Sequence, residues 1–353
     1  MKIVFCGLSI TSSWGNGHAT NYRALVRELT AHGHEVLFLE RDVPWYASQR
    51  DLPEPPWGRT ELYGSLEELE RHGGDVAAAD LVVVGSYVPE GVAVAEWVLE
   101  RAGGAVAFYD IDTPVTLGKL RRGDTEYLSP ELVGRFDLYL SFTGGPTLQV
   151  LEREFGARRA LAFYCLVDPE AYRPLQETPS WDLGYLGTYS DDRQPVLERL
   201  LVEPARLMPE GEFAVAGPQY PEEIEWPGNV ERIEHVAPGD HRRFYASQRF
   251  TLNVTRAEMR AAGWSPSVRL FEAAACAVPV ISDRWDGLEE IFTPGEEILV
   301  ADSAEDVVRY LAETGEDKRL ALGERARARV LAEHTAERRC EQLEQEVTGA
   351  AVR

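Results

Sequence analysis

The chain has 353 residues, of which 44% are hydrophobic and 27% are charged, a balance typical of globular proteins large enough for two domains. Its 36 basic and 59 acidic residues give a formal net charge of -23. This charge argues against a nucleic-acid-binding protein and against binding to anionic lipid, because both functions need a basic surface.

The first half of the sequence alternates apolar segments with amphipathic helical ones. The opening apolar run, Ile3–Leu8, is too short for a signal peptide or a membrane span, which predicts a cytoplasmic protein without a transmembrane segment. Helices are expected at Thr20–His32 and Val92–Arg101. Strands are expected at Ile3–Leu8, Glu35–Leu39, Leu81–Gly85, Ala105–Tyr109, Phe136–Phe142 and Ala160–Tyr164.

A segment with three prolines and no periodicity, Val167–Trp181, then reads as a linker, after which the same alternation restarts. Strands are expected at Leu183–Gly187, Phe213–Gly217, Phe250–Val254, Pro279–Ser282 and Ile298–Val300. Helices are expected at Gln194–Arg206, Ser267–Cys276, Ala304–Glu313, Glu316–Glu333 and about Glu333–Val347.

Apolar strands separated by amphipathic helices predict an α/β fold with parallel sheets covered on both faces. We therefore expect two doubly wound, Rossmann-like domains that face each other across a cleft, at residues 1–166 and 167–335. Residues 336–353 should form a C-terminal helix that packs back toward the first domain. In such sheets ligands bind at the carboxyl ends of the strands.

The cysteines are scattered and form no Cys-x-x-Cys pair, which predicts free thiols rather than a disulfide or a metal site. They are Cys6, Cys165, Cys276 and Cys340.

A glycine-containing loop between the first strand and the first helix includes Gly15, Asn16 and Gly17. It can border the cleft or hold an anion at the helix N-terminus. His18 follows the loop, and a neutral imidazole there would suit a general base that deprotonates an acceptor hydroxyl. The alternative interpretation makes His18 a residue that only starts the helix.

The same loop also permits a weaker dinucleotide-binding hypothesis. The pattern Gly15-x-Gly17-x-x-Thr20 would hold the pyrophosphate, with Glu40 on the ribose. Thr20 stands where that fingerprint has a third small residue, so the match is incomplete.

Two carboxylates, Asp110 and Asp112, follow the strand at Ala105–Tyr109. Residues two apart on a strand lie on the same face of the sheet, so the two carboxylates could together orient an acceptor hydroxyl or bind a divalent ion. A turn before Thr113-Pro114 is the alternative interpretation.

In the second half, Arg193 follows a strand and a glycine turn and could pair with a phosphate, or lie exposed at a helix start. Ser265 and Ser267 precede a helix rich in small residues, whose N-terminus could bind a diphosphate. Glu272 on that helix could accept hydrogen bonds from two ribose hydroxyls.

These residues lie in motifs that resemble the donor-binding half of GT-B glycosyltransferases, and most closely the spore-maturation, CgeB-like group. The motifs are Arg269-x-Phe271-Glu272-Ala273-x-Ala275, Pro279-Val280-Ile281-Ser282 and Gly287-Leu288-Glu289-Glu290. The linker and the turn from Gly187 to Arg193 are also similar to their counterparts in that group.

The resemblance implies transfer of a sugar from a nucleoside diphosphate sugar, of the UDP, GDP or dTDP type, to a glycan or small-molecule acceptor. It assigns the donor ribose to Glu272 and the diphosphate to Arg193, and it places Arg269 and Glu290 in the donor site. It implies no metal and no further cofactor.

One departure leaves the stereochemistry open, because Trp264 stands where retaining enzymes of the glycogen-synthase-like type carry a glutamate. A nucleotide-sugar epimerase, an NAD-dependent dehydrogenase and an inactive nucleotide- or glycan-binding module remain alternative functions.

Overall fold

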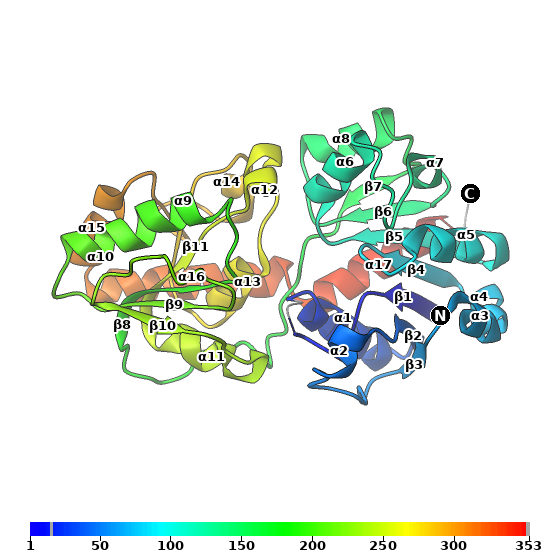
Figure 1. The fold of residues 1–353 in the computed structure, drawn as a ribbon, viewed down its shortest axis with the longest axis horizontal. Coiled ribbons are helices and arrows are strands. Elements are labelled where there is room, and N and C mark those ends of the chain that lie inside the picture. Colours follow the sequence, from blue (N-terminus) through cyan, green and yellow to red (C-terminus); the bar gives the residue numbers. More distant parts are fainter. Residues whose placement is uncertain (15–16, 351–353) are drawn as a thin grey trace. The chain divides into compact units, whose positions relative to one another are not determined.

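A computed structural model describes residues 1–14 and 17–350, and the chain divides into two compact units (Figure 1). The N-terminal unit comprises residues 1–166 and the segment that begins at Ala336, and the C-terminal unit comprises residues 167–335. The chain therefore passes twice between the units. At this crossing Val167 pairs with Thr335, and its N–H donates to the His334 carbonyl at 2.9 Å.

The N-terminal unit contains a parallel sheet with the strand order β3-β2-β1-β4-β5-β6-β7. Its described strands are β1 (Lys2–Gly7), β2 (Glu35–Arg41), β3 (Arg59–Tyr63), β4 (Leu81–Gly85), β5 (Ala105–Asp110), β6 (Leu138–Ser141) and β7 (Ala160–Ala162). Its described helical segments are α1 (Ala19–Ala31), α2 (Pro44–Ala47), α3 (Leu66–Leu69), η1 (Glu70–His72), α4 (Gly73–Ala77), α5 (Gly91–Arg101), α6 (Thr113–Arg121), α7 (Pro130–Val133), α8 (Pro146–Arg153) and α17 (Ala336–Ala350).

The C-terminal unit repeats the plan with the parallel strand order β10-β9-β8-β11-β12-β13. Its described strands are β8 (Trp181–Leu186), β9 (Phe213–Ala216), β10 (Val230–Ile233), β11 (Gln248–Asn253), β12 (Val280–Ser282) and β13 (Leu299–Val300). Its described helical segments are α9 (Gln194–Leu197), η2 (Glu198–Val202), α10 (Glu203–Leu207), α11 (Pro238–Ala246), α12 (Ala257–Ala262), α13 (Val268–Ala275), α14 (Leu288–Ile291), α15 (Ala304–Glu313) and α16 (Glu316–Glu333).

Each sheet has a point where the strand order reverses, between β1 and β4 in the first and between β8 and β11 in the second. Central strands of both sheets are largely buried. Val82, Val84 and Phe108 are fully buried in the N-terminal core, as are Phe250 and Leu252 in the C-terminal core. Ligands of doubly wound folds bind at such reversal points, beyond the carboxyl ends of the strands.

The predicted α/β class and the two Rossmann-like sheets are confirmed. The sequence reading missed the edge strands β3 and β10, which carry the polar sequences RTELY and VERI. An edge strand has a partner on one side only and tolerates polar residues, so its apolar signal is weak.

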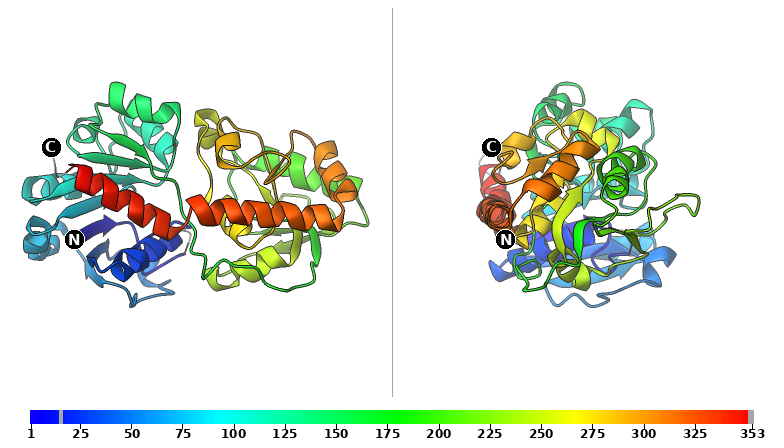
Figure 2. Two further views of the ribbon diagram at one scale, coloured as in Figure 1. Left: turned by 180° about the vertical axis from the view of Figure 1, so that it is seen from behind. Right: turned by 90° about the vertical axis from the view of Figure 1, so that its left-hand side faces the viewer.

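Helix α17 packs against α1, so the end of the chain completes the N-terminal unit (Figure 2). In the described part of the chain, every helix is too short or too polar to span a lipid bilayer. All four cysteines are buried free thiols.

Candidate functional site

The start of helix α13 is fixed to the carboxyl end of β11, at the reversal point of the C-terminal sheet. The Ser267 hydroxyl donates to Asn253 Oδ1 at 2.8 Å, and Asn253 Nδ2 donates to the Ser282 hydroxyl at 2.9 Å. Asn253 is the last residue of β11, and Ser267 immediately precedes α13. These bonds fix the position of the α13 N-terminus, whose N–H groups and positive dipole end suit an anion.

Glu272 lies on α13 and is 5% exposed. Its Oε2 accepts a hydrogen bond from the Tyr245 hydroxyl at 3.0 Å, and His241 Nδ1 lies 3.9 Å from the same oxygen. The Tyr172 hydroxyl is in turn 3.2 Å from His241 Nδ1. Burial raises the pKa of Tyr245 well above its usual value, and the charge on Glu272 raises it further, so the tyrosine stays a donor. The carboxylate is thus held in one orientation before any ligand arrives.

The sequence reading did not identify Tyr172, His241 and Tyr245. Tyr172 lies in the predicted linker, and the other two lie on α11, a helix that the reading did not expect. No spacing in the sequence connects these segments with Glu272, because α11 and α13 meet only in the folded unit.

Arg269 contacts residues at the ends of two strands of its own unit, and its place in a donor site stays a prediction. Its Nη1 donates to Asn253 Oδ1 at 3.2 Å, its Nε donates to the Leu186 carbonyl, and its guanidinium lies 4.7 Å from the centre of the Tyr185 ring. The residue is 8% exposed. Arg269 therefore links the carboxyl ends of β8 and β11.

Arg193 begins α9, after the loop that follows β8. Its Nη2 donates to the Thr188 carbonyl at 2.7 Å, while its buried Nε has no hydrogen-bond partner among the described residues. Burial raises the pKa of Tyr220, and the charges of Arg232, Arg193 and Arg269 oppose that rise. Three guanidinium groups thus lie near one tyrosine in a protein of strongly negative net charge.

Arg232 is a further residue that the sequence reading missed. Its guanidinium lies 4.1 Å from the centre of the Tyr220 ring and 5.1 Å from that of Trp226, and its Nη2 donates to the Gly217 carbonyl at 3.0 Å. Burial lowers its pKa from the usual value. A guanidinium close to aromatic rings gains a favourable cation–π interaction.

The remaining predicted donor residues lie around the same helix start or on a neighbouring helix. Ser265 is buried just ahead of α13, and Trp264 has a left-handed backbone with φ of 43°. The Trp264 ring packs so closely on Gly287 that a Cβ there would lie 2.5 Å from it. Glu290 is exposed on α14, and its role stays a prediction.

In the N-terminal unit, the loop after β1 is held by Glu40, which is fully buried. Its Oε2 accepts from the N–H groups of Ile10 and Thr11 at 2.7 and 3.0 Å. Its Oε1 accepts from the hydroxyls of Thr11 and Ser9 at 2.6 and 3.1 Å. With these four hydrogen bonds, Glu40 faces its own loop instead of a ribose, which argues against the dinucleotide hypothesis.

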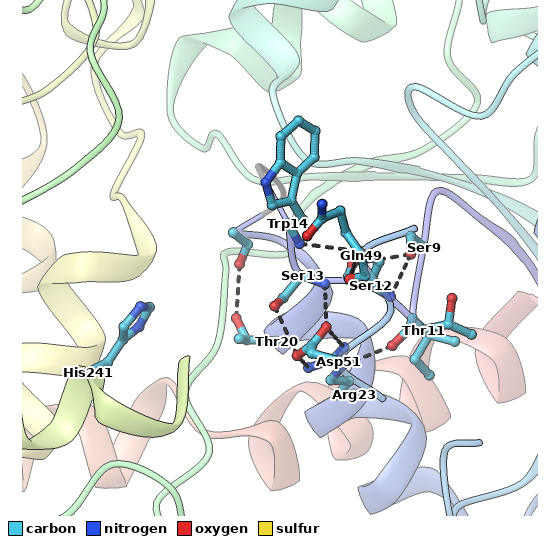
Figure 3. A network of polar contacts seen from close by, with 12 residues as sticks. Ser9, Thr11, Ser12, Ser13, Trp14, Thr20, Arg23, Gln49, Asp51 and His241 are labelled. Carbon is cyan, nitrogen blue, oxygen red and sulfur yellow. Dashed lines mark hydrogen bonds and ion pairs between the residues drawn. The ribbon is translucent and has the colours of Figure 1, made fainter. Parts of the chain in front are cut away.

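The same loop is attached to α1 and the segment after α2 through Asp51 (Figure 3). Arg23 Nη1 and Nη2 donate to its two carboxylate oxygens at 2.8 and 2.9 Å, and the Ser13 N–H donates at 2.8 Å. Burial would raise the pKa of Asp51, but the hydrogen bonds from Arg23 and Ser13 and the arginine charge lower it to about 2.

Of the predicted loop residues, Gly15 and Asn16 lie outside the described residues, and Gly17 is exposed. His18 immediately precedes α1 and is half-buried, with its ring centre 5.7 Å from that of Phe142. The assignment of His18 as a general base stays a prediction.

Asp110 and Asp112 do not form the one-sided pair that was expected. Asp110 is fully buried, and it accepts hydrogen bonds from the Tyr139 hydroxyl at 2.6 Å and the Thr116 hydroxyl at 2.8 Å. Asp112 lies beyond the end of β5, so strand alternation does not apply to it, and it accepts from the Tyr87 hydroxyl at 3.0 Å. Burial raises the pKa of Asp110 to about 6, against the effect of these hydrogen bonds. Asp112 is thus the more accessible of the two, and a catalytic role for either residue stays a prediction.

The comparison with known families gives a match in the second half of the chain. Residues 193–345 match the family model described as "Glycosyl transferase-like". The match covers less than half of the chain and lies mostly in the C-terminal unit. The matched range contains all six predicted donor residues, which are Arg193, Ser265, Ser267, Arg269, Glu272 and Glu290. No curated protein matches the chain.

Solved structures show the fold of the whole chain. Sucrose-phosphate synthase from Thermosynechococcus elongatus is similar with a TM-score of 0.70 and 15% identity, and the match covers 100% of both chains. HepE from Anabaena, solved with UDP and glucose, is similar with a TM-score of 0.71 and 14% identity over 99% of this chain and 100% of HepE. An α-glucosyltransferase solved with UDP-glucose and DNA that contains an abasic site has a TM-score of 0.70 and 14% identity, over 98% and 99% of the two chains. The chain has the GT-B fold.

Proposed function

We propose that this chain is a glycosyltransferase that moves a hexosyl group from a nucleoside diphosphate sugar to a hydroxyl-bearing acceptor. The observation that carries the proposal is the match of residues 193–345 to the glycosyl transferase-like family. The Arg269–Ala275 motif supports a place in the CgeB-like group.

The geometry around Glu272 supports recognition of the donor ribose. A carboxylate has about four acceptor positions, so Glu272 can hold Tyr245 and still accept from vicinal hydroxyls. Because Tyr245 and His241 already orient the carboxylate, little side-chain freedom is lost when the ligand binds.

The diphosphate is proposed to bind at the N-terminus of α13 with help from Arg193. A guanidinium pairs well with phosphate oxygens, and Arg193 Nε lacks a partner among the described residues. Arg232 and Arg269 add local positive charge, which offsets the net charge of -23 that would otherwise repel a nucleotide.

UDP-glucose is the first donor to test, because HepE and the α-glucosyltransferase were solved with UDP or UDP-glucose. For the acceptor, the strongly acidic chain favours a neutral or cationic glycan or small molecule over DNA. In the proposed reaction the acceptor oxygen bonds to the anomeric carbon, the bond to the diphosphate breaks, and His18 takes the hydroxyl proton.

The test begins with thermal stabilisation of the full chain by UDP, GDP, dTDP, CMP and NAD. A ligand that binds only the folded state raises the melting temperature in proportion to RT ln(1 + [L]/Kd). We expect a clear shift with one nucleoside diphosphate, followed by release of that diphosphate from its sugar when an acceptor is added. An epimerised nucleotide sugar without release would instead support the epimerase, and stabilisation by NAD alone would contradict the proposal.

A further inference from the structure

Four side chains that commonly bind metals meet where α17 packs against the end of α1, within the N-terminal unit. Cys340 and Glu344 lie one helical turn apart on α17, so they share a face of that helix. His32 and His34 flank the glycine turn that ends α1. Figure 2 shows α17, in red, beside α1, in blue.

The donor atoms of three of these residues converge. His32 Nδ1 lies 3.1 Å from Glu344 Oε1 and 3.4 Å from Cys340 Sγ, and the sulfur lies 3.8 Å from the same oxygen. A tetrahedral zinc ion with ligand bonds of about 2.0–2.3 Å holds its ligand atoms about 3.3–3.7 Å apart. The three atoms thus have nearly the spacing of three corners of a tetrahedral zinc site.

The surroundings orient these groups and favour a cation. His34 Nε2 lies 2.7 Å from Glu344 Oε1, which fixes the carboxylate as a second-layer hydrogen bond does in metal sites. His34 Nδ1 contacts the Met1 amino group at 3.1 Å. On the far side of the His32 ring, Nε2 lies 3.7 Å from Glu28 Oε1. A thiol and two carboxylates therefore surround one imidazole.

An ion can reach the site from solvent. The side chains of His32 and Glu344 are 28% and 32% exposed, whereas Cys340 is fully buried.

We propose that His32, Cys340 and Glu344 bind one Zn²⁺ ion, with a water molecule as the fourth ligand, and that the ion fixes α17 to α1. A thiolate and an imidazole select zinc over magnesium or calcium, which prefer oxygen ligands. None of these residues belongs to the proposed nucleotide-sugar site. The ion is a structural clamp, and the proposal does not depend on the transfer reaction.

The experiment uses the full chain after removal of metals with a chelator, titrated with Zn²⁺ and separately with Co²⁺ as a spectroscopic probe. We expect one ion per chain, a sulfur-to-cobalt charge-transfer band, and a rise in melting temperature with Zn²⁺. His32→Gln should weaken Zn²⁺ binding at least about tenfold, the smallest loss usual even for second-layer partners. The matched control is His235→Gln, because His235 is also exposed but lies in the other unit, and it should leave binding unchanged.

Two further variants, each with a matched control, test the other two ligands. Cys340→Ala should abolish the sulfur-to-cobalt charge-transfer band, whereas the control Cys165→Ala should retain it. Glu344→Gln should weaken binding, whereas Glu341→Gln, on the same helix, should not. If Cys340→Ala fails to fold, the Zn²⁺ affinity of His32→Gln still tests the proposal, because His32 is exposed and its replacement should not prevent folding. The absence of saturable binding, a cobalt spectrum without the sulfur band, or an unchanged affinity in His32→Gln and Glu344→Gln would each overturn the proposal.

Discussion

The Tyr245 hydroxyl on α11 donates to Glu272 Oε2 on α13 at 3.0 Å, in surroundings where both side chains are almost completely buried. A buried polar group is costly unless it is hydrogen-bonded, so this contact offsets part of the cost of burying the Glu272 side chain. The same contact fixes the orientation of the Glu272 carboxylate. Stability and the proposed ribose recognition therefore share one hydrogen bond.

Replacing Glu272 should separate these two effects. We expect Glu272→Gln to weaken nucleoside diphosphate binding by about 1–3 kcal/mol, because an amide presents one acceptor oxygen where the carboxylate presents two. Tyr245→Phe should cause a smaller loss, since it removes the orienting bond but keeps the carboxylate. Isothermal titration with the nucleotide found in the thermal screen measures both. Unchanged affinity in Glu272→Gln would remove the ribose assignment.

Gly217 should be intolerant of a side chain. Its φ is +141°, and a Cβ there would lie 2.1 Å from the Gly187 carbonyl oxygen. Gly217→Ala should therefore displace the loop after β8 and lower the free energy of unfolding by about 1–3 kcal/mol. Urea unfolding measures the loss, and nucleotide stabilisation should decrease with it. Gly228→Ala is the control, because a Cβ at Gly228 meets nothing within 4 Å.

His18 should matter for turnover rather than for donor binding. If it is the general base, His18→Gln lowers kcat by about 10²–10⁴-fold and leaves the nucleotide affinity nearly unchanged. Release of the diphosphate measures turnover, and calorimetry measures affinity. His72→Gln, in the same unit, should leave both unchanged. Parallel losses of turnover and affinity in His18→Gln would assign it a binding role instead.

The Arg23–Asp51 pair should make stability depend on acid pH. The pKa of Asp51 is about 2 in the folded protein and about 3.9 in an unfolded chain, so the folded state binds this proton less tightly. Its stabilisation is present above about pH 4 and is lost as the pH falls toward 2. Melting temperatures from pH 5 to 2 should fall less steeply in Asp51→Asn than in the unmodified chain.

Asp75→Asn provides the control for that comparison, because it removes a partner of Arg59 at the surface. In Asp75→Asn, the melting temperature should fall between pH 5 and pH 2 about as steeply as in the unmodified chain. An equal slope in Asp51→Asn and the unmodified chain would mean that the bidentate pair contributes nothing in solution.

The amino-acid sequence was sufficient to predict the repeated strand and helix pattern and the position of helix α13. Strands such as Leu81–Gly85 are buried on both faces, so they must be apolar along their whole length, and that signal is local. The segment from Ser265 to Glu272 is also local, since the residues that begin a helix and the residue one turn further along it lie close together in sequence.

Other roles depend on partners that sequence spacing does not reveal. Glu40 and Arg269 are each plausible ligand-binding residues from their positions, yet the structure directs both toward neighbouring loops and strand ends. Asp110 faces Tyr139 and Thr116 because it ends a buried strand beside β6 and α6. A side chain's direction is set by what packs beside it, and those neighbours come from distant segments.

The sequence by itself determined that the chain forms two doubly wound α/β sheets and that the second contains the helix that begins after Ser267. Only the tertiary structure joined Tyr172, His241 and Tyr245 to Glu272, and only it brought Cys340 to His32, 308 residues away. The physical reason is that periodicity and helix starts follow from interactions between near neighbours along the chain. Which side chains share a site depends on how whole helices pack, and that packing is a property of the complete folded unit.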